Sequence, residues 1–141
     1  MELFKIVAFK LGEEEYGLEI EYVKSIERIH QVTRVPNAPE YVKGVINLRG
    51  NVTPIIDLRS MLSQGEANYT ENSRVIITKF DDIELGLIVD QTSNVIDIDP
   101  QDIEAPSAGG IDSNYIGGIA KVQGRLISLI KLAELVGVTS N

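Results

Sequence analysis

The stretch Val42–Leu62, VKGVINLRGNVTPIIDLRSML, predicts a β-hairpin followed by a short helix. Two runs rich in β-branched residues, 44–48 and 52–56, flank the turn 49–51, in which Gly50 is free to adopt positive φ. Arg49 is a long cation at the tip of this hairpin, and the turn itself has no need of it.

Two residues mark the far end of the return strand. Pro54 lacks the N–H that a strand ladder uses, so it predicts an edge strand or an end of the sheet. Asp57 is expected to cap a helical turn over residues 58–62.

Composition restricts the class of protein. At 141 residues, with 43% hydrophobic and 24% charged, the chain is long enough for one ordinary domain or two very small ones. The formal charge of −8 argues against nucleic acid and anionic membrane surfaces as partners. The absence of cysteine excludes disulfides, thiolate zinc sites and catalytic thiols. Without a signal-peptide pattern or a membrane-spanning apolar run, the expected location is the cytoplasm.

Taken in order, the chain shows short strand patterns separated by polar segments. Residues 4–11 and 16–20 predict two strands joined by a charged turn. Residues 21–28, with Val23 and Ile26 at three-residue spacing, fit either a helical turn or a strand entry. A Pro-Asn turn marks residues 29–38 as a connection, and 64–73 is a polar loop at the midpoint.

The chain contains an internal repeat. Residues 5–29 align with 74–98 without a gap, and 42–62 align with 116–136 in the same way. Glycines fall in register in both blocks: Gly17 with Gly86, Gly44 with Gly118, and Gly50 with Gly124. Chance similarity between two β-rich halves is the alternative, but two ungapped blocks in the same order favour a tandem duplication.

Each half is expected to hold about five short strands with glycine turns, which is typical of a small closed barrel. A half of about 70 residues has a marginal core, so the halves should pack together and exchange a strand. We expect the first barrel mainly in 12–72 and the second mainly in 73–137, with a groove between them.

The duplication separates structural from functional residues. Arg49 corresponds to Gln123 and Asn47 to Lys121, so the hairpin fold does not require arginine at its tip. Arginine is frequent at binding hot spots, although a solvated surface arginine is the alternative.

Signals for catalysis are weak. The single histidine, His30, has no nucleophile near it in the pattern, and Gly109-Gly110 precedes no helix. Asp81-Asp82 suits a solvated hairpin turn better than a cation site, because it aligns with the turn at Gly12-Glu13. We expect no catalytic, metal-binding or cofactor-binding residue.

Four segments carry a family resemblance: EEYGLEIEYVKSIER, TRVPNAPEYVKGVINLRGNVTPIIDLR, IELGLIVDQTSNVIDI and IGGIAKVQGRLISLIKLAELV. Together they resemble the CheW-type chemotaxis adaptor from Phe4 to Val136, and are similar to the regulatory domain of the chemotaxis histidine kinase CheA. The resemblance implies an all-β fold of two intertwined SH3-like five-stranded barrels and no catalysis. It implies two partners, the CheA regulatory domain and the cytoplasmic tip of methyl-accepting chemoreceptors. Location in the cytoplasm at membrane-bound receptor arrays follows, with no nucleic acid and no membrane insertion.

The same resemblance assigns two binding surfaces. The residues it implies for a receptor groove are Val7, Ile20, Val23, Ile26, Val89, Thr92 and Val95. The residues it implies for a partner-binding hairpin are Gly44, Asn47, Leu48, Arg49 and Gly50. Val23 and Ile26 fit a core role equally well, and Ser25 stands where many relatives carry an acidic residue.

Other classes remain open at this stage. A stand-alone SH3-like or OB-like module for saccharide or oligonucleotide is opposed by the charge and by the absence of tryptophan. The end of the chain at Asn141 favours a free adaptor over an adaptor–receiver fusion or a kinase fragment.

Overall fold

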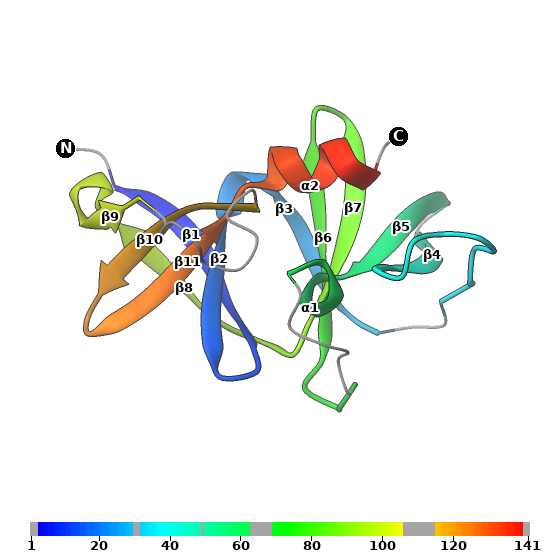
Figure 1. The fold of residues 1–141 in the computed structure, drawn as a ribbon, viewed down its shortest axis with the longest axis horizontal. Helices are drawn as coiled ribbons and strands as arrows, with labels where there is room; N and C mark the ends of the chain where they lie inside the picture. The colour runs from blue at the N-terminus through cyan, green and yellow to red at the C-terminus, as the bar shows by residue number, and fades with distance from the viewer. Residues whose placement is uncertain (1–2, 30–31, 49, 63–68, 106–114, 140–141) are drawn as a thin grey trace.

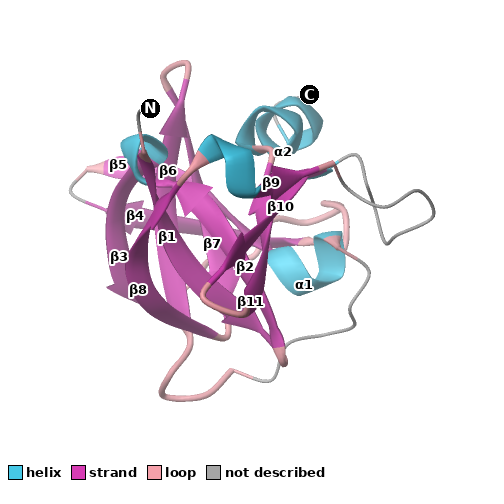
Figure 2. Cartoon of the chain, turned by 90° about the vertical axis from the view of Figure 1, so that its left-hand side faces the viewer, coloured by secondary structure: helices cyan, strands magenta, loops and turns pink. Residues whose placement is uncertain are grey.

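The computed structural model describes residues 3–29, 32–48, 50–62, 69–105 and 115–139. Short strands dominate, in two curved sheets that lie side by side in Figure 1. Figure 2 shows the same strands from the side, with the helices at their margins.

Five strands and two short helices precede residue 74, where the second copy of the repeat begins with β6. In order, the elements through β6 are β1 (Phe4–Leu11), β2 (Glu14–Glu19), the 3-10 helix η1 (Ile20–Tyr22), β3 (Val23–Arg28), β4 (Val42–Leu48), β5 (Asn51–Asp57), α1 (Leu58–Met61) and β6 (Arg74–Phe80). The remaining elements are β7 (Ile83–Val89), β8 (Gln91–Ile98), η2 (Pro100–Asp102), β9 (Ile103–Glu104), β10 (Ile116–Val122), β11 (Arg125–Ile130) and α2 (Leu132–Thr139).

The internal repeat is visible in this order. The elements β1-β2-β3 recur as β6-β7-β8, and β4-β5-α1 recur as β10-β11-α2. The all-β fold, the duplication and the resemblance to two intertwined barrels are therefore confirmed.

Each sheet takes strands from both halves of the chain. Sheet A has the order β8-β1-β2-β11-β10-β9, and sheet B has the order β3-β6-β7-β5-β4. The expected ranges 12–72 and 73–137 do not follow this division, because the chain changes sheet between β2 and β3 and again between β7 and β8. Sheet A also has six strands rather than five, since the two-residue β9 pairs with β10.

Two parallel pairings join the halves within the sheets. β2 pairs with β11 in sheet A, and β5 pairs with β7 in sheet B. Three of the interior strands, β1, β6 and β7, bury side chains on both faces, so each reads as a nearly continuous apolar run.

Three apolar clusters result. One lies inside sheet A around Ile6 and Ile127, and one lies inside sheet B around Ile55 and Val75. The third, which we call the shared core, lies between the sheets and receives residues from both halves. Its buried members are Phe9, Leu11, Tyr16, Leu18, Ile56, Leu58, Met61, Leu62, Ile76, Leu85, Leu87, Val89, Ile116, Leu132, Leu135 and Val136. The helix α2 crosses above the junction of the sheets in Figure 1.

Gly17 and Gly86 show why the repeat keeps glycines in register. A Cβ on Gly17 would lie 2.5 Å from Cδ1 of Ile6, and one on Gly86 would lie 2.9 Å from Cγ1 of Val75. Both glycines sit on interior strands that press against the core inside their own sheet. Their shared requirement is space rather than an unusual backbone angle.

The local expectations for residues 42–62 are confirmed. Gly50 has φ +86°, and the Asp57 carboxylate accepts a hydrogen bond from the Arg59 backbone N–H at 3.1 Å. β5 is an interior strand, so Pro54 is not on an edge strand, but it lies beyond the part of β5 that pairs with β7, as the end-of-sheet alternative expected. It stands opposite Val45 of β4 and just before the three residues by which β5 pairs with β7.

The other local expectations have mixed outcomes. Asp81 and Asp82 form the exposed turn between β6 and β7, as expected. Pro36-Asn37 also forms the predicted turn. His30 and Gly109-Gly110 lie outside the described residues, as does most of the midpoint loop.

Candidate functional site: partner-binding surfaces

Two edge strands present exposed aliphatic side chains at equivalent positions of the repeat. β3 is an edge of sheet B and β8 is an edge of sheet A. Ile26 on β3 is 42% exposed, and its repeat counterpart Val95 on β8 is 50% exposed. In the view of Figure 2 both edge strands run along the same side of the molecule.

Strand pairing shows which face Ile26 and Val95 occupy. Ile26 stands opposite Ile76, a shared-core residue of β6. Val95 stands opposite Val7 on β1, two residues before the shared-core residue Phe9. Residues directly opposite in an antiparallel pair point to the same face. Both exposed side chains therefore extend the face of their sheet that packs against the other sheet.

A bulge in each edge strand explains the three-residue spacing. Between Val23 and Ser25 the β3–β6 register shifts by one residue, and a similar shift occurs between the partners of Val7 and Phe9 on β8. Such a bulge places residues i and i+3 on one face of a strand. Val23 and Ile26 thus share a face, as do Thr92 and Val95. The open question about residues 21–28 is answered: they form a 3-10 turn followed by a bulged strand.

The expected groove residues divide by burial. Ile20, Ile26 and Val95 are exposed, whereas Val23 and Thr92 are half-buried, with Val23 packed against the shared core. Val7 is 5% exposed and Val89 is 1% exposed. These two are corrections, because buried side chains offer no surface to a partner.

Val89 differs from its counterpart Ile20 for a topological reason. The chain leaves β2 through the 3-10 helix η1, which turns Ile20 outward. β7 instead continues through Val89 into the shared core, and a single residue then leads into β8. Equivalence in sequence does not give equivalent exposure here.

Acidic groups lie around the part of this surface that belongs to the first half of the repeat, near η1. Burial raises the pKa of the Glu19 carboxyl, and the neighbouring Glu21 raises it further. Glu21 is also the main cause of a raised pKa at the Tyr22 phenol, followed by burial and by Glu19 and Asp81. This end of the surface favours a partner with basic side chains.

Ser25 does not lie on the same face as Val23 and Ile26. It stands opposite Ile77, which belongs to the core inside sheet B. The exchange of an acidic residue for serine therefore changes a position behind the apolar face rather than within it.

The β4–β5 hairpin forms the second candidate surface. Asn47 is exposed, Leu48 is half-buried against the core inside sheet B, and Arg49 lies outside the described residues. Gly44 has a structural role, because a Cβ there would collide with the backbone carbonyl of Thr33. Gly50 forms the turn.

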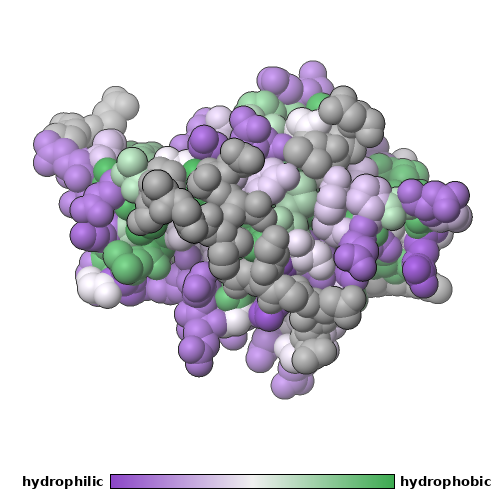
Figure 3. Space-filling view, viewed as in Figure 1, coloured by the Kyte–Doolittle hydropathy of each residue, from purple (hydrophilic) through white to green (hydrophobic). Residues whose placement is uncertain are grey.

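Beside this hairpin tip lies an exposed aliphatic residue that was not predicted from the sequence. Val52 is 65% exposed and stands opposite Asn47, and its repeat counterpart Leu126 is 61% exposed and stands opposite Lys121. Figure 3 shows apolar surface at both ends of the molecule, over the β10–β11 and β4–β5 hairpins. The alignment of the two halves could have identified Val52, since both hairpins carry an apolar residue at this outward position.

Within the described ranges, no group of three or more His, Cys, Asp or Glu side chains is arranged to hold a metal ion. The same part of the chain contains no helix that is both long and apolar enough to cross a bilayer. The exposed aliphatic residues described above supply contact area on two edge strands and two hairpins.

Comparison with known proteins identifies the family. The CheW-like domain family matches residues 5–139. The chemotaxis protein CheW of Bacillus subtilis (strain 168) is 42% identical over 128 residues, covering 89% of this chain and 82% of the relative. The chemotaxis protein CheW of Klebsiella aerogenes is 38% identical over 133 residues, covering 93% and 80%.

A solved structure gives the same result in three dimensions. The crystal structure of the scaffolding protein TtCheW from Thermoanaerobacter tengcongensis superposes with a TM-score of 0.87 at 40% identity. The superposition covers 94% of this chain and 86% of that chain. Fold, repeat and sequence thus agree, and the chain belongs to the CheW-like domain family.

Proposed function

We propose that this protein is a non-catalytic adaptor of bacterial chemotaxis that joins the cytoplasmic tip of chemoreceptors to the histidine kinase CheA. The relatives named as chemotaxis proteins CheW and the scaffolding protein TtCheW support the process and the scaffold role. The proposed location is the cytoplasm, at membrane-bound receptor arrays that the adaptor reaches through its partners.

The observation that carries the receptor part is the pair of equivalent edge strands. Ile26 and Val95 extend the shared apolar face to the surface, where a receptor helix with apolar and basic residues would bury them. Ile20, Val23 and Thr92 complete this receptor-facing surface.

The hairpin β4–β5 is proposed as the surface for the CheA regulatory domain. Asn47 and Val52 supply exposed polar and apolar contacts beside the tip. Arg49 is proposed to add a cationic contact, since the repeat shows that the hairpin folds with glutamine at this position.

A binding experiment tests the proposal. Purified protein is titrated with a receptor cytoplasmic fragment and, separately, with the CheA regulatory domain. Ile26→Asp and Val95→Asp should each weaken receptor binding by about tenfold or more, because each places a charge in an apolar contact. Val35→Asp is the matched control, since Val35 is 44% exposed but lies on the connection before β4. Wild-type protein that binds neither partner would refute the proposal.

A further inference from the structure

A single residue, Asp90, carries the chain from sheet B to sheet A. It lies between the last residue of β7 and the first residue of β8. Its backbone N–H donates to the Lys10 carbonyl at 3.0 Å, and its Oδ2 accepts a hydrogen bond from the Gly12 N–H at 2.6 Å. Both contacts fix the crossing point to the end of β1.

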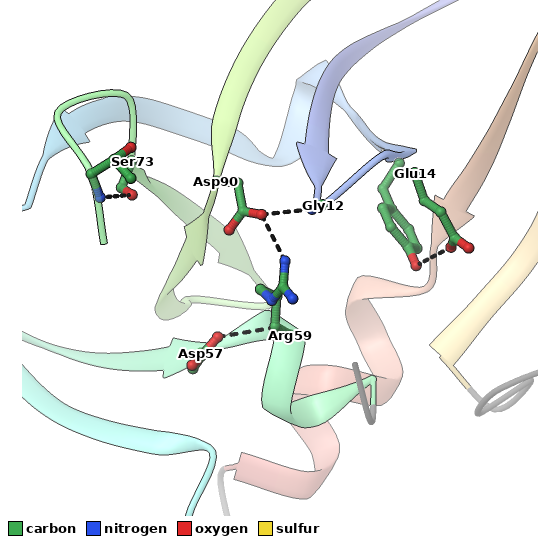
Figure 4. A network of polar contacts seen from close by, with 8 residues as sticks. Gly12, Glu14, Asp57, Arg59, Ser73 and Asp90 are labelled. Atoms are coloured by element: carbon green, nitrogen blue, oxygen red, sulfur yellow. Dashed lines mark hydrogen bonds and ion pairs between the residues drawn. The ribbon is translucent and has the colours of Figure 1, made fainter. Parts of the chain in front are cut away.

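Arg59 holds the same carboxylate from a third element. Its Nη1 donates to Asp90 Oδ2 at 2.8 Å, and its backbone N–H donates to Asp57, the residue that caps α1. Figure 4 shows the three segments meeting at Asp90. The Arg59 and Asp90 side chains are 22% and 27% exposed. A charge-assisted contact at this burial is stronger than a solvated surface pair.

The residues at the equivalent positions of the other crossover cannot form this ion pair. In the alignment of the halves, Arg59 corresponds to Ala133, Asp90 to Glu21 and Gly12 to Asp81. That crossover instead packs the ring of Tyr22 against the ring of Phe80, with 5.4 Å between centroids. The fold therefore does not require an arginine–aspartate pair at a crossover, and its presence on one side points to a specialised task.

The position of Asp90 indicates what that task is. Thr92 follows it by two residues and Val95 by five, with the β8 bulge between them. β8 is an edge strand, and among the described strands β1 is its one neighbour. Its start is held by β1 and by Asp90.

We propose that Arg59 and Asp90 are a positioning pair that fixes the start of β8 and thereby the receptor-facing Thr92 and Val95. Arg59 belongs to the helix that directly follows the β4–β5 hairpin. The pair therefore links the helix that follows the proposed kinase-binding hairpin to the strand that carries part of the proposed receptor surface. The effect of the pair on receptor binding rests on the proposed function, whereas its effect on the start of β8 does not.

Hydrogen exchange of the free protein tests whether the pair fixes the start of β8. In Arg59→Ala and in Asp90→Asn, amides of residues 91–95 should exchange about tenfold faster than in wild type, as expected for loss of a charged hydrogen bond. Amides in the β6–β7 pairing should keep their rates. Lys121→Ala is the control, since it removes the Lys121–Glu104 ion pair between β10 and β9, at the opposite edge of sheet A from β8, and should leave 91–95 unchanged. Unchanged exchange at 91–95 in both variants, or a uniform increase across both sheets, would overturn the inference.

Binding measurements test whether the pair positions Thr92 and Val95 for the receptor. Arg59→Ala and Asp90→Asn should raise the Kd for a receptor cytoplasmic fragment by about threefold to tenfold, with an unchanged Kd for the CheA regulatory domain. Faster exchange at 91–95 with unchanged receptor affinity would overturn the link to the receptor surface. If wild-type protein binds no receptor fragment, the proposed function fails, and the exchange experiment still decides the positioning role.

Discussion

Val95 lies directly opposite Val7 in the antiparallel pairing of β8 with β1, yet the two differ tenfold in exposure, at 50% and 5%. They share one face of sheet A, with Val7 covered by the neighbouring structure and Val95 at the margin of the sheet. Val7 thus has the role of supporting the surface from beneath, whereas Val95 is the one of the two that is accessible to a partner.

Val7→Ala should destabilise the fold by about 1–3 kcal/mol, because it leaves a cavity beneath the surface. Val95→Ala should change the free energy of unfolding by at most about 0.5 kcal/mol, yet weaken receptor binding. Urea unfolding and receptor titration of both variants measure the two effects. Equal stability losses would place Val95 in the core and remove it from the receptor surface.

The hydroxyl of Thr53 is buried on β5, and no described residue accepts a hydrogen bond from it or donates one to it. Its repeat counterpart is Ile127, an apolar core residue. Thr53→Val should therefore raise the free energy of unfolding by about 1 kcal/mol. The control is Thr78→Val: the buried Thr78 hydroxyl donates to the Leu85 carbonyl at 2.8 Å, so its loss should lower stability by about 1 kcal/mol. Destabilisation by Thr53→Val would show that its hydroxyl has a partner.

Glu15 and Arg125 join β2 to β11 through two hydrogen bonds of 3.0 and 2.5 Å. The hydrogen bond from Arg125 is the main cause that lowers the pKa of the Glu15 carboxyl below its ordinary value of 4.5. A lowered folded-state pKa means that this contribution to stability is complete above the unfolded-state pKa and is lost as pH falls through the folded-state pKa.

Glu15→Gln should accordingly reduce the loss of stability that wild type shows on acidification below about pH 4.5, the ordinary value of this group. Urea unfolding of both proteins in steps from neutral pH to pH 3 supplies the comparison. Parallel curves for the two proteins would mean that Arg125 does not favour the charged form of Glu15.

Gly17 has no room for a side chain, since an added Cβ would lie 2.5 Å from Cδ1 of the buried Ile6. Gly17→Ala should therefore destabilise the fold by about 1–3 kcal/mol through overpacking. Gly137→Ala is the control, because Gly137 lies in α2 and, apart from the helix itself, no described residue has an atom within 4 Å of an added Cβ. That substitution should leave stability unchanged or raise it by up to about 1 kcal/mol. A neutral Gly17→Ala would mean that the sheet interior adjusts easily.

Local signals explain how much of the fold the sequence predicted. The hairpin turn at Gly50 and the Asp57 cap depend on residues close together in the chain, and both are present. The crossing of β3 and β8 into the other sheet depends on long-range pairing, which propensity does not encode. The ranges 12–72 and 73–137 differ from the division of strands between the sheets for that reason.

The edge-strand surface that we propose for the receptor was predictable only in part, for similar reasons. The three-residue spacing of Val23 and Ile26 was ambiguous because a β-bulge imitates helical spacing. Carrying Ile20 over to Val89 failed because η1 has no counterpart at the end of β7. Val52 could have been predicted by comparing the outward positions of the two hairpins, which the duplication makes possible.

The most direct test is a three-component titration of this protein with a receptor cytoplasmic fragment and the CheA regulatory domain. Wild-type protein should bind both at once. Ile26→Asp should lose the receptor and keep the kinase domain, while Arg49→Ala should impair coupling by about 2 kcal/mol, roughly thirtyfold in affinity, and Gln123→Ala far less. Circular dichroism of each variant confirms that it is folded. Folded Ile26→Asp and Arg49→Ala proteins that assemble both partners like wild type would contradict the adaptor role assigned to these two surfaces.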